Sequence, residues 1–118
     1  MSRMKADPAK AAEFYRHACS GRVGEGCYNV GQMLDQGRVP GEKDDKRMHR
    51  RVAKFFGLAC RDGVARGCIN LGAMKYEGTE IAQDHKGALL LFRRGCELGE
   101  GTACGHAGSM VSKGEGTK

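Results

Sequence analysis

The sequence predicts an all-α fold: a solenoid of three αα-hairpin repeats, with six helices and one disulfide in each repeat. Three observations predict it. Six cysteines form three pairs with the same eight-residue step, a short motif recurs after the second cysteine of every pair, and an apolar stripe precedes every first cysteine. The cysteines are Cys19, Cys27, Cys60, Cys68, Cys96 and Cys104. Self-similarity of this kind, at offsets of 41 and 36 residues, is typical of repeat architectures.

The first helix of each repeat is predicted by its apolar stripe, whose steps of three and four residues mark one helical face. Asp7 and Asp84 stand four residues before the first alanine of a stripe, where they suit an N-cap or the first turn. We expect these helices near residues 8–20, 45–61 and 84–97. The stripes are Ala11, Phe14, Tyr15 and Ala18, then Val52, Phe55, Phe56 and Ala59, then Ala88, Leu91, Phe92 and Gly95.

The second helix of each repeat begins near the second cysteine, and a closing glycine follows it at Gly37, Gly78 and Gly114. We expect these helices near residues 24–36, 65–77 and 101–113. Each contains a glycine in register, which costs about 1 kcal/mol against alanine in a helix. These glycines are Gly31, Gly72 and Gly108. Their recurrence predicts the close approach of a neighbouring helix backbone.

The 118 residues fit a single domain, 1–118, with repeats at about 7–37, 45–78 and 84–114. In one unbroken helix, residues eight apart are separated by about 12 Å. A disulfide tolerates a Cα separation of only about 7 Å, so each bridged pair must straddle a chain reversal. Gly21, Gly63 and Gly99 lie where the first helix should stop. Pairing within repeats is the simplest of the fifteen connectivities that six cysteines allow.

Disulfides favour an oxidising compartment, although the sequence shows no apolar signal segment and no transmembrane run. A missing leader, import by oxidative trapping and a reducing environment with free thiols all remain open. We expect the mitochondrial intermembrane space if the protein is eukaryotic, and the periplasm or secretion if it is bacterial.

The pattern around the cysteine pairs, of which Gly67-Cys68-Ile69-Asn70-Leu71-Gly72-Ala73-Met74 is one copy, resembles the cysteine-rich branch of the Sel1-like repeat family. This branch includes the Helicobacter cysteine-rich proteins and mitochondrial respiratory-complex assembly factors. The resemblance implies a right-handed superhelix related to tetratricopeptide arrays, with one disulfide inside each hairpin. It also implies two functions: assembly of respiratory complexes, and penicillin binding with weak β-lactamase activity.

We expect a non-enzymatic adaptor that binds a protein or peptide segment on its concave face. If the array curves as tetratricopeptide arrays do, the second helices line that face. Asn29 and Asn70 match positions at which such arrays hold an extended peptide backbone, although these amides could equally satisfy neighbouring backbone inside the solenoid. The expected concave residues are Glu25, Tyr28, Asn29, Gln32 and Asp35, then Arg66, Ile69, Asn70, Ala73 and Tyr76.

The alternative function, a penicillin-binding protein with weak β-lactamase activity, rests on the resemblance alone. The sequence has one Ser-x-x-Lys, Ser2-Arg3-Met4-Lys5, and neither Ser-Asp-Asn nor Lys-Thr-Gly, so no β-lactamase constellation is complete. We therefore expect no catalytic residue.

The net charge is +6, and the densest basic run lies in the third expected helix. Its apolar residues fall at helical spacing, so the basic residues form the solvated face of an amphipathic helix and offer a secondary contact for an acidic partner. The basic patch is Lys46, Arg47, Arg50, Arg51 and Lys54. The four histidines, at positions 17, 49, 85 and 106, are too scattered to predict a metal site. We expect no cofactor, metal or nucleic acid.

Overall fold

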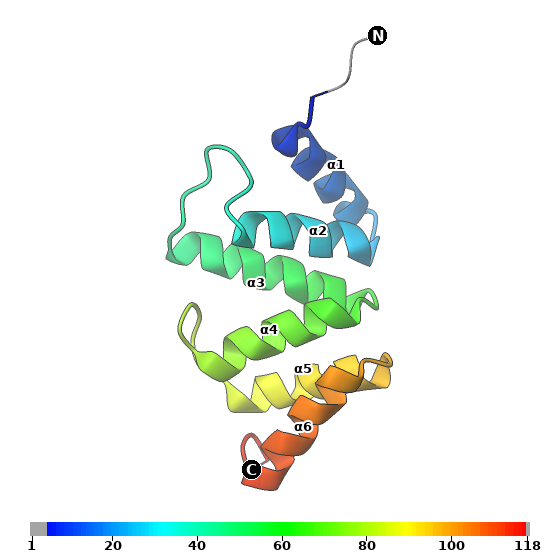
Figure 1. The fold of residues 1–118 in the computed structure, drawn as a ribbon, viewed down its shortest axis with the longest axis vertical. Coiled ribbons are helices and arrows are strands. Elements are labelled where there is room, and N and C mark those ends of the chain that lie inside the picture. Colours follow the sequence, from blue (N-terminus) through cyan, green and yellow to red (C-terminus); the bar gives the residue numbers. More distant parts are fainter. Residues whose placement is uncertain (1–4, 118) are drawn as a thin grey trace.

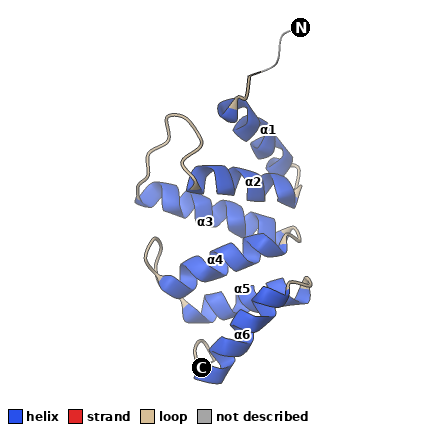
Figure 2. Ribbon diagram, in the orientation of Figure 1, coloured by secondary structure: helices blue, strands red, loops and turns tan. Residues whose placement is uncertain are grey.

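The computed structural model describes residues 5–117 and contains six helices stacked along one axis (Figure 1). They are α1 (Pro8–Ser20), α2 (Gly24–Asp35), α3 (Lys46–Arg61), α4 (Ala65–Glu77), α5 (His85–Glu97) and α6 (Gly101–Lys113). The described residues form no strand (Figure 2). The predicted all-α hairpin fold is therefore confirmed.

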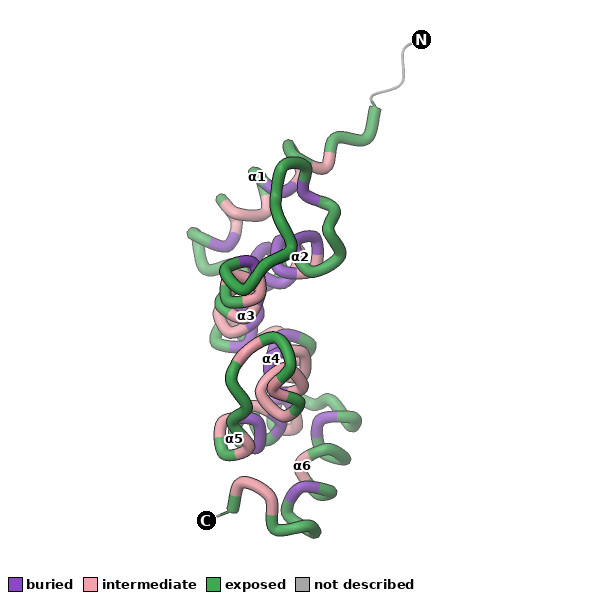
Figure 3. Tube along the Cα trace, turned by 90° about the vertical axis from the view of Figure 1, so that its left-hand side faces the viewer, coloured by how far each residue is buried: buried purple, intermediate pink, exposed green. Residues whose placement is uncertain are grey.

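The helices form three antiparallel hairpins, and consecutive helices are packed against each other along the whole chain. Seen from the side, α1, α3 and α5 lie in one layer and α2, α4 and α6 in the other (Figure 3). The molecule measures 58 × 30 × 23 Å, and its radius of gyration is 15.5 Å. A compact domain of this length would have a radius of about 13.5 Å. The chain is thus an elongated array in which each hairpin contacts mainly its neighbours.

Three aspartates begin the first helices, because each places a carboxylate oxygen on the backbone N–H three residues later. Asp7 accepts from Lys10 N at 3.0 Å and Asp84 from Gly87 N at 2.9 Å. Asp45 accepts from Met48 N at 2.9 Å, and the sequence analysis did not identify this cap.

The three disulfides pair cysteines within hairpins, as the simplest connectivity predicts. Cys19 bonds Cys27, Cys60 bonds Cys68 and Cys96 bonds Cys104. The paired Cα atoms lie 4.5 to 4.6 Å apart, which is possible only because each pair straddles the turn between two helices. Three closed bridges indicate an oxidising, non-cytosolic environment. No helix of residues 5–117 has the length and apolar character needed to cross a bilayer.

Glycine residues govern the packing inside each hairpin and between hairpins. A methyl group added to Gly26 would lie 2.8 Å from the Tyr15 carbonyl oxygen, so α1 and α2 approach each other closely there. Gly31 and Gly72 face aromatic rings: an added methyl would lie 3.0 Å from Phe56 and 2.9 Å from Phe92. The expectation that a neighbouring backbone approaches these two glycines is therefore wrong, because the next hairpin supplies a ring instead.

The first hairpin turn differs from the other two in its left-handed residue. Gly63 and Gly99 adopt positive φ in the second and third turns, whereas Arg22 takes that position in the first, at φ 66°. Arg22 donates to the Asp62 carboxylate of the next turn at 2.9 Å. A link between two hairpins thus offsets the backbone cost of a non-glycine residue in this conformation.

Candidate functional site

A cleft of about 680 Å³ lies beside the first hairpin. The start of α1 forms one wall and α2 the other, and Arg66 of α4 closes one end. Four of the predicted concave residues line it: Tyr28, Asn29, Gln32 and Arg66. The remaining lining residues are Ala6, Asp7, Pro8, Ala11, Tyr15, Met33, Gln36 and Arg38.

Tyr28 forms the rigid base of this cleft. Its side chain is buried, and its ring packs on Phe56 with 5.7 Å between centroids. The guanidinium carbon of Arg66 lies 4.4 Å from the centre of the same ring, a cation–π contact. Arg66 also forms an ion pair with Glu25 at 3.2 Å. The position of the Arg66 cation at the cleft is therefore fixed from two sides.

The two candidate asparagines differ in what they contact. Asn70 donates from Nδ2 to the Tyr28 hydroxyl at 3.4 Å, so its amide is partly used inside the solenoid. Asn29 and Gln32 are half-buried and form no side-chain hydrogen bond with any residue in 5–117. Their amides are left to water or to a bound segment. The role predicted for each residue stays a prediction.

The other predicted concave residues lie away from this cleft. Ile69 and Tyr76 pack against the second core cluster, which is built around Phe92. The Tyr76 ring stacks on His85 at 4.7 Å, and its hydroxyl donates to Glu115 at 2.9 Å, which raises the pKa of the phenol. Ala73 lies with Tyr76 at a smaller hollow. Asp35 of α2 is exposed and lies outside the cleft.

The smaller hollow has a volume of about 280 Å³, and its position in the third hairpin corresponds to the position of the cleft in the first. Phe92, His106 and Met110 line it at the repeat positions of Tyr15, Asn29 and Met33. Here the preceding helix α4 narrows the space with Ala73, Tyr76 and Glu77. No hairpin precedes α1 within the described residues, so the first hairpin's cleft stays wide.

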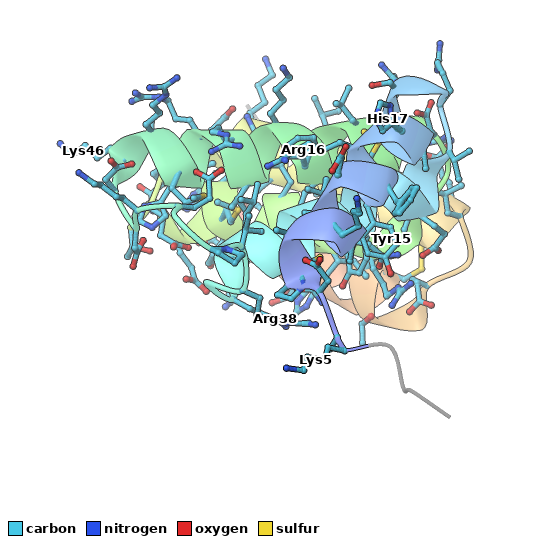
Figure 4. All side chains as sticks on the ribbon, turned by 90° about the horizontal axis from the view of Figure 1, so that it is seen from above. Lys5, Tyr15, Arg16, His17, Arg38 and Lys46 are labelled. Atoms are coloured by element: carbon cyan, nitrogen blue, oxygen red, sulfur yellow. A yellow bond between two sulfur atoms is a disulfide. The ribbon has the colours of Figure 1, made fainter. Side chains whose placement is uncertain are left out.

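The start of α1 and Arg38 were not predicted as site residues. The signal was present in the repeat: Tyr15 occupies the position of Phe56 and Phe92, two rings that the preceding hairpin covers. A ring at that position with no preceding hairpin leaves apolar surface beside α2. Figure 4, which looks onto the N-terminal end of the stack, shows Tyr15 on α1 and Arg38 beside the start of that helix.

The basic patch lies on α3, in the layer away from the cleft. Lys46, Arg47, Arg50 and Lys54 are exposed and form no ion pair with any residue in 5–117. Arg51 instead donates to Glu42 at 2.7 Å, and this hydrogen bond lowers the pKa of the Glu42 carboxyl. Four of the five predicted cations are thus available to an acidic partner.

The structure describes the surroundings of all four histidines. Ser2, the serine of the only Ser-x-x-Lys, lies outside the described residues. His49 contacts Asp44 at 2.8 Å and Glu80 at 3.2 Å, whereas His85 and His106 stack on Tyr76 and Phe92, and His17 is exposed. Among the described residues, no group of three or more His, Cys, Asp and Glu side chains is arranged to hold a metal ion.

No family model and no curated protein matches the sequence. Three solved structures are similar. A Sel1 repeat protein from Oxalobacter formigenes aligns over 98% of this chain with a TM-score of 0.83 and 22% identity, a likeness that shows the fold. Cysteine rich protein B from Helicobacter pylori aligns over 85% of this chain with a TM-score of 0.75 and 29% identity. A protective antigen of uropathogenic Escherichia coli strains, which displays an SLR fold, aligns over 92% with a TM-score of 0.76 and 28% identity.

The chain spans 45% of the Oxalobacter protein, 71% of the Helicobacter protein and 22% of the Escherichia coli protein. Its three hairpins, the disulfide in each and the agreement with these structures support the resemblance seen in the sequence. The chain therefore has the fold of Sel1-like repeat proteins, with one disulfide in each hairpin.

Proposed function

We propose that this protein is a non-enzymatic adaptor that binds an extended segment of a partner protein in the cleft between α1 and α2. The Sel1-repeat fold itself suggests a protein-interaction scaffold. One observation carries the assignment to this cleft: Asn29 and Gln32 present amides that no residue in 5–117 satisfies. We expect the concave face of the array to be the surface that the predicted residues of α2 and α4 form together.

An extended peptide matches this arrangement chemically. Each residue of its backbone carries one donor and one acceptor, and an asparagine or glutamine amide offers the complementary acceptor and donor. Tyr15, Tyr28 and Met33 supply apolar contacts for the peptide side chains. Arg38 and Arg66 lie at the cleft and favour a segment that carries an acidic residue.

A second contact for the partner is proposed at the basic patch on α3. Its four unpaired cations would attract an acidic region and raise the association rate more than the final affinity. Partner binding should then weaken as salt rises, because exposed charges are screened over about 8–10 Å at physiological ionic strength.

The test begins with a displayed random-peptide library that is selected on the disulfide-intact protein. A selected peptide should bind Asn29→Ala about tenfold more weakly, because a hydrogen bond to a buried peptide group contributes about 1–1.5 kcal/mol. Asp35→Ala, on the same helix but outside the cleft, is the matched control and should leave the affinity unchanged. Asn70→Ala should have a smaller effect than Asn29→Ala, since its amide already contacts Tyr28.

Two results would contradict the proposal. Peptides that bind equally well to Asn29→Ala and to the parent would place the contact elsewhere. Turnover of nitrocefin by the oxidised protein that persists after Ser2 is replaced would show that the protein is more than an adaptor.

A further inference from the structure

The two junctions between hairpins are built in the same way. At the first junction, Phe56 of α3 packs on Gly31 of α2, and a methyl group on that glycine would lie 3.0 Å from the ring. At the second, Phe92 of α5 packs on Gly72 of α4, where the corresponding distance is 2.9 Å. A glycine on the second helix of one hairpin therefore receives a ring from the first helix of the next.

The first junction has another contact of this type at the turn. Val64, which precedes α4, packs on Gly24 at the start of α2, and a methyl group on Gly24 would lie 2.8 Å from it. In the same region Arg22 and Asp62 join the two turns by an ion pair of 2.9 Å. The surface that the first hairpin presents to the second thus has a pair of glycines, whereas the second hairpin has Ala65 at the repeat position of Gly24 and presents Gly72 alone.

The third hairpin presents the same surface with nothing packed on it. Gly101 and Gly108 of α6 stand at the repeat positions of Gly24 and Gly31, and an added methyl group on either would meet no atom within 4 Å. Val111, on the same helix, is 56% exposed. We call these three residues the C-terminal end face.

The first hairpin has the complementary set of side chains without a glycine surface to receive them. Tyr15 stands at the position of Phe56 and Phe92, and Val23 at the position of Val64. Val23 is 52% exposed, and the neighbouring Phe14 is 67% exposed. Phe14, Tyr15 and Val23 form the N-terminal end face. Three of the four exposed large hydrophobic residues of the described chain therefore belong to the two end faces.

The turns at the two ends carry different charges. Glu97, the last residue of α5, and Glu100, in the turn before α6, are exposed, and residues 97–100 include no cation. Residues 20–23 include Arg22 and no carboxylate, but Arg22 already pairs with Asp62 of the second hairpin. The match between the two end faces therefore rests on their small and apolar residues and not on the charges of the turns.

We propose that a second copy of this chain docks head to tail, with α1 of one copy packed on α6 of the other. The incoming Tyr15 and Val23 would contact Gly108 and Gly101, as Phe56 and Val64 contact Gly31 and Gly24 within the chain. A contact between two different faces leaves one face free on each partner, so the assembly continues beyond a dimer unless it closes into a ring. The docked α6 would also narrow the cleft beside Tyr15, as α4 narrows the hollow of the third hairpin.

Sedimentation equilibrium on the oxidised protein tests this proposal. The average mass should rise with concentration above the monomer value of 12.7 kDa and pass the dimer value. Gly108→Gln fills the C-terminal end face, and Phe14→Glu places a charge on the N-terminal end face; each variant alone should remain monomeric. Lys113→Gln introduces the same side chain at an exposed position of α6 whose repeat equivalents, Gln36 and Glu77, stay exposed at the two junctions, and this variant should assemble as the parent does.

A mixture of the two blocked variants separates head-to-tail docking from other modes. Gly108→Gln keeps the N-terminal end face and Phe14→Glu keeps the C-terminal one, so together they should form a one-to-one complex and nothing larger. A parent protein that stays at the monomer mass would overturn the proposal, as would a mixture in which both variants remain monomeric while the parent assembles. Circular dichroism of each variant checks that the helices are retained. Because assembly would narrow the cleft, peptide binding at Asn29 is measured on the two blocked variants, whose substitutions lie outside the cleft.

Discussion

Replacing Gly67 with alanine tests how closely the two helices of a hairpin are packed. A methyl group on Gly67 would lie 2.7 Å from the Phe56 carbonyl oxygen, 2.8 Å from the Ala59 Cβ and 3.0 Å from the Cys60 nitrogen. Two of these three atoms belong to the backbone, so α3 and α4 must separate to accept it. Overpacking of this kind costs about 1–3 kcal/mol, of which the better helix propensity of alanine offsets about 1 kcal/mol. We expect Gly67→Ala to lower the free energy of unfolding by up to about 2 kcal/mol.

The third hairpin suggests a second substitution that should restore stability. There the two small residues are exchanged: Gly95 of α5 faces Ala103 of α6, with 2.9 Å between an added methyl and the Ala103 Cβ. The double variant Ala59→Gly/Gly67→Ala reproduces that order in the second hairpin. The double variant should recover at least half of the free energy of unfolding that Gly67→Ala loses. Coupling energies between two residues in contact are about 0.5–3 kcal/mol, which is large enough for this recovery.

Urea denaturation of the oxidised protein, followed by far-ultraviolet circular dichroism, measures these changes provided that the denaturant slopes agree. Gly105→Ala is the matched control, because that glycine has no atom within 4 Å of an added methyl. It should raise the free energy of unfolding by about 1 kcal/mol. The reasoning fails if Gly67→Ala is as stabilising as Gly105→Ala, or if the double variant is no more stable than Gly67→Ala.

Three further predictions follow from the caps, the turns and the disulfides. Hydrogen bonds from Arg61 and Arg22 lower the pKa of the Asp62 carboxyl from 3.8 to about 2, so its stabilising effect is present above pH 3.8 and is lost as the pH falls toward 2. In a plot of the unfolding midpoint against pH, Asp62→Asn should therefore reduce the slope between pH 3.8 and about 2. An unchanged slope would show that this carboxyl does not contribute to the pH dependence of stability. Asp45→Ala should cost about 1 kcal/mol in urea denaturation, because Asp45 caps α3. The Cys96–Cys104 bridge should be reduced first by a limiting phosphine, since Cys104 is exposed whereas Cys27 and Cys68 have no exposed surface. Alkylation and peptide mapping of the partly reduced protein measure this order, and reduction of another bridge first would contradict it.

Much of the fold follows from local signals that the sequence repeats three times. The steps of three and four residues place the apolar stripes on one face of α1, α3 and α5, and the eight-residue cysteine step forces a reversal within each pair. The predicted range of α3, residues 45–61, differs from Lys46–Arg61 by its cap alone. Such features depend on residues close together in the chain.

The candidate site was harder to predict because its geometry depends on contacts between hairpins. Asn29 and Asn70 occupy the same position of the repeat, and nothing in the residues around them predicts different contacts for the two amides. They differ because Tyr28 offers Asn70 a hydroxyl acceptor from the preceding hairpin. No hairpin precedes α1 within the described residues, so Asn29 has no such neighbour. The cleft beside the first hairpin is wide for the same reason, because no described helix stands beside it as α4 stands beside the hollow of the third hairpin.

Comparison of the three hairpins also indicates where this protein carries individual chemistry. Positions that agree in all three, such as the cysteines, hold the fold. The first helices differ in charge: α3 carries six Lys and Arg residues and no carboxylate, whereas α1 and α5 carry two and three with one carboxylate each. The second helices differ at one position of the repeat, which is Asn29 in α2, Asn70 in α4 and His106 in α6. The proposed basic contact therefore belongs to the second hairpin, because neither of the other first helices carries as many cations. The proposed peptide cleft belongs to the first hairpin, because Asn70 already contacts Tyr28 and the third hairpin has a histidine in place of the amide.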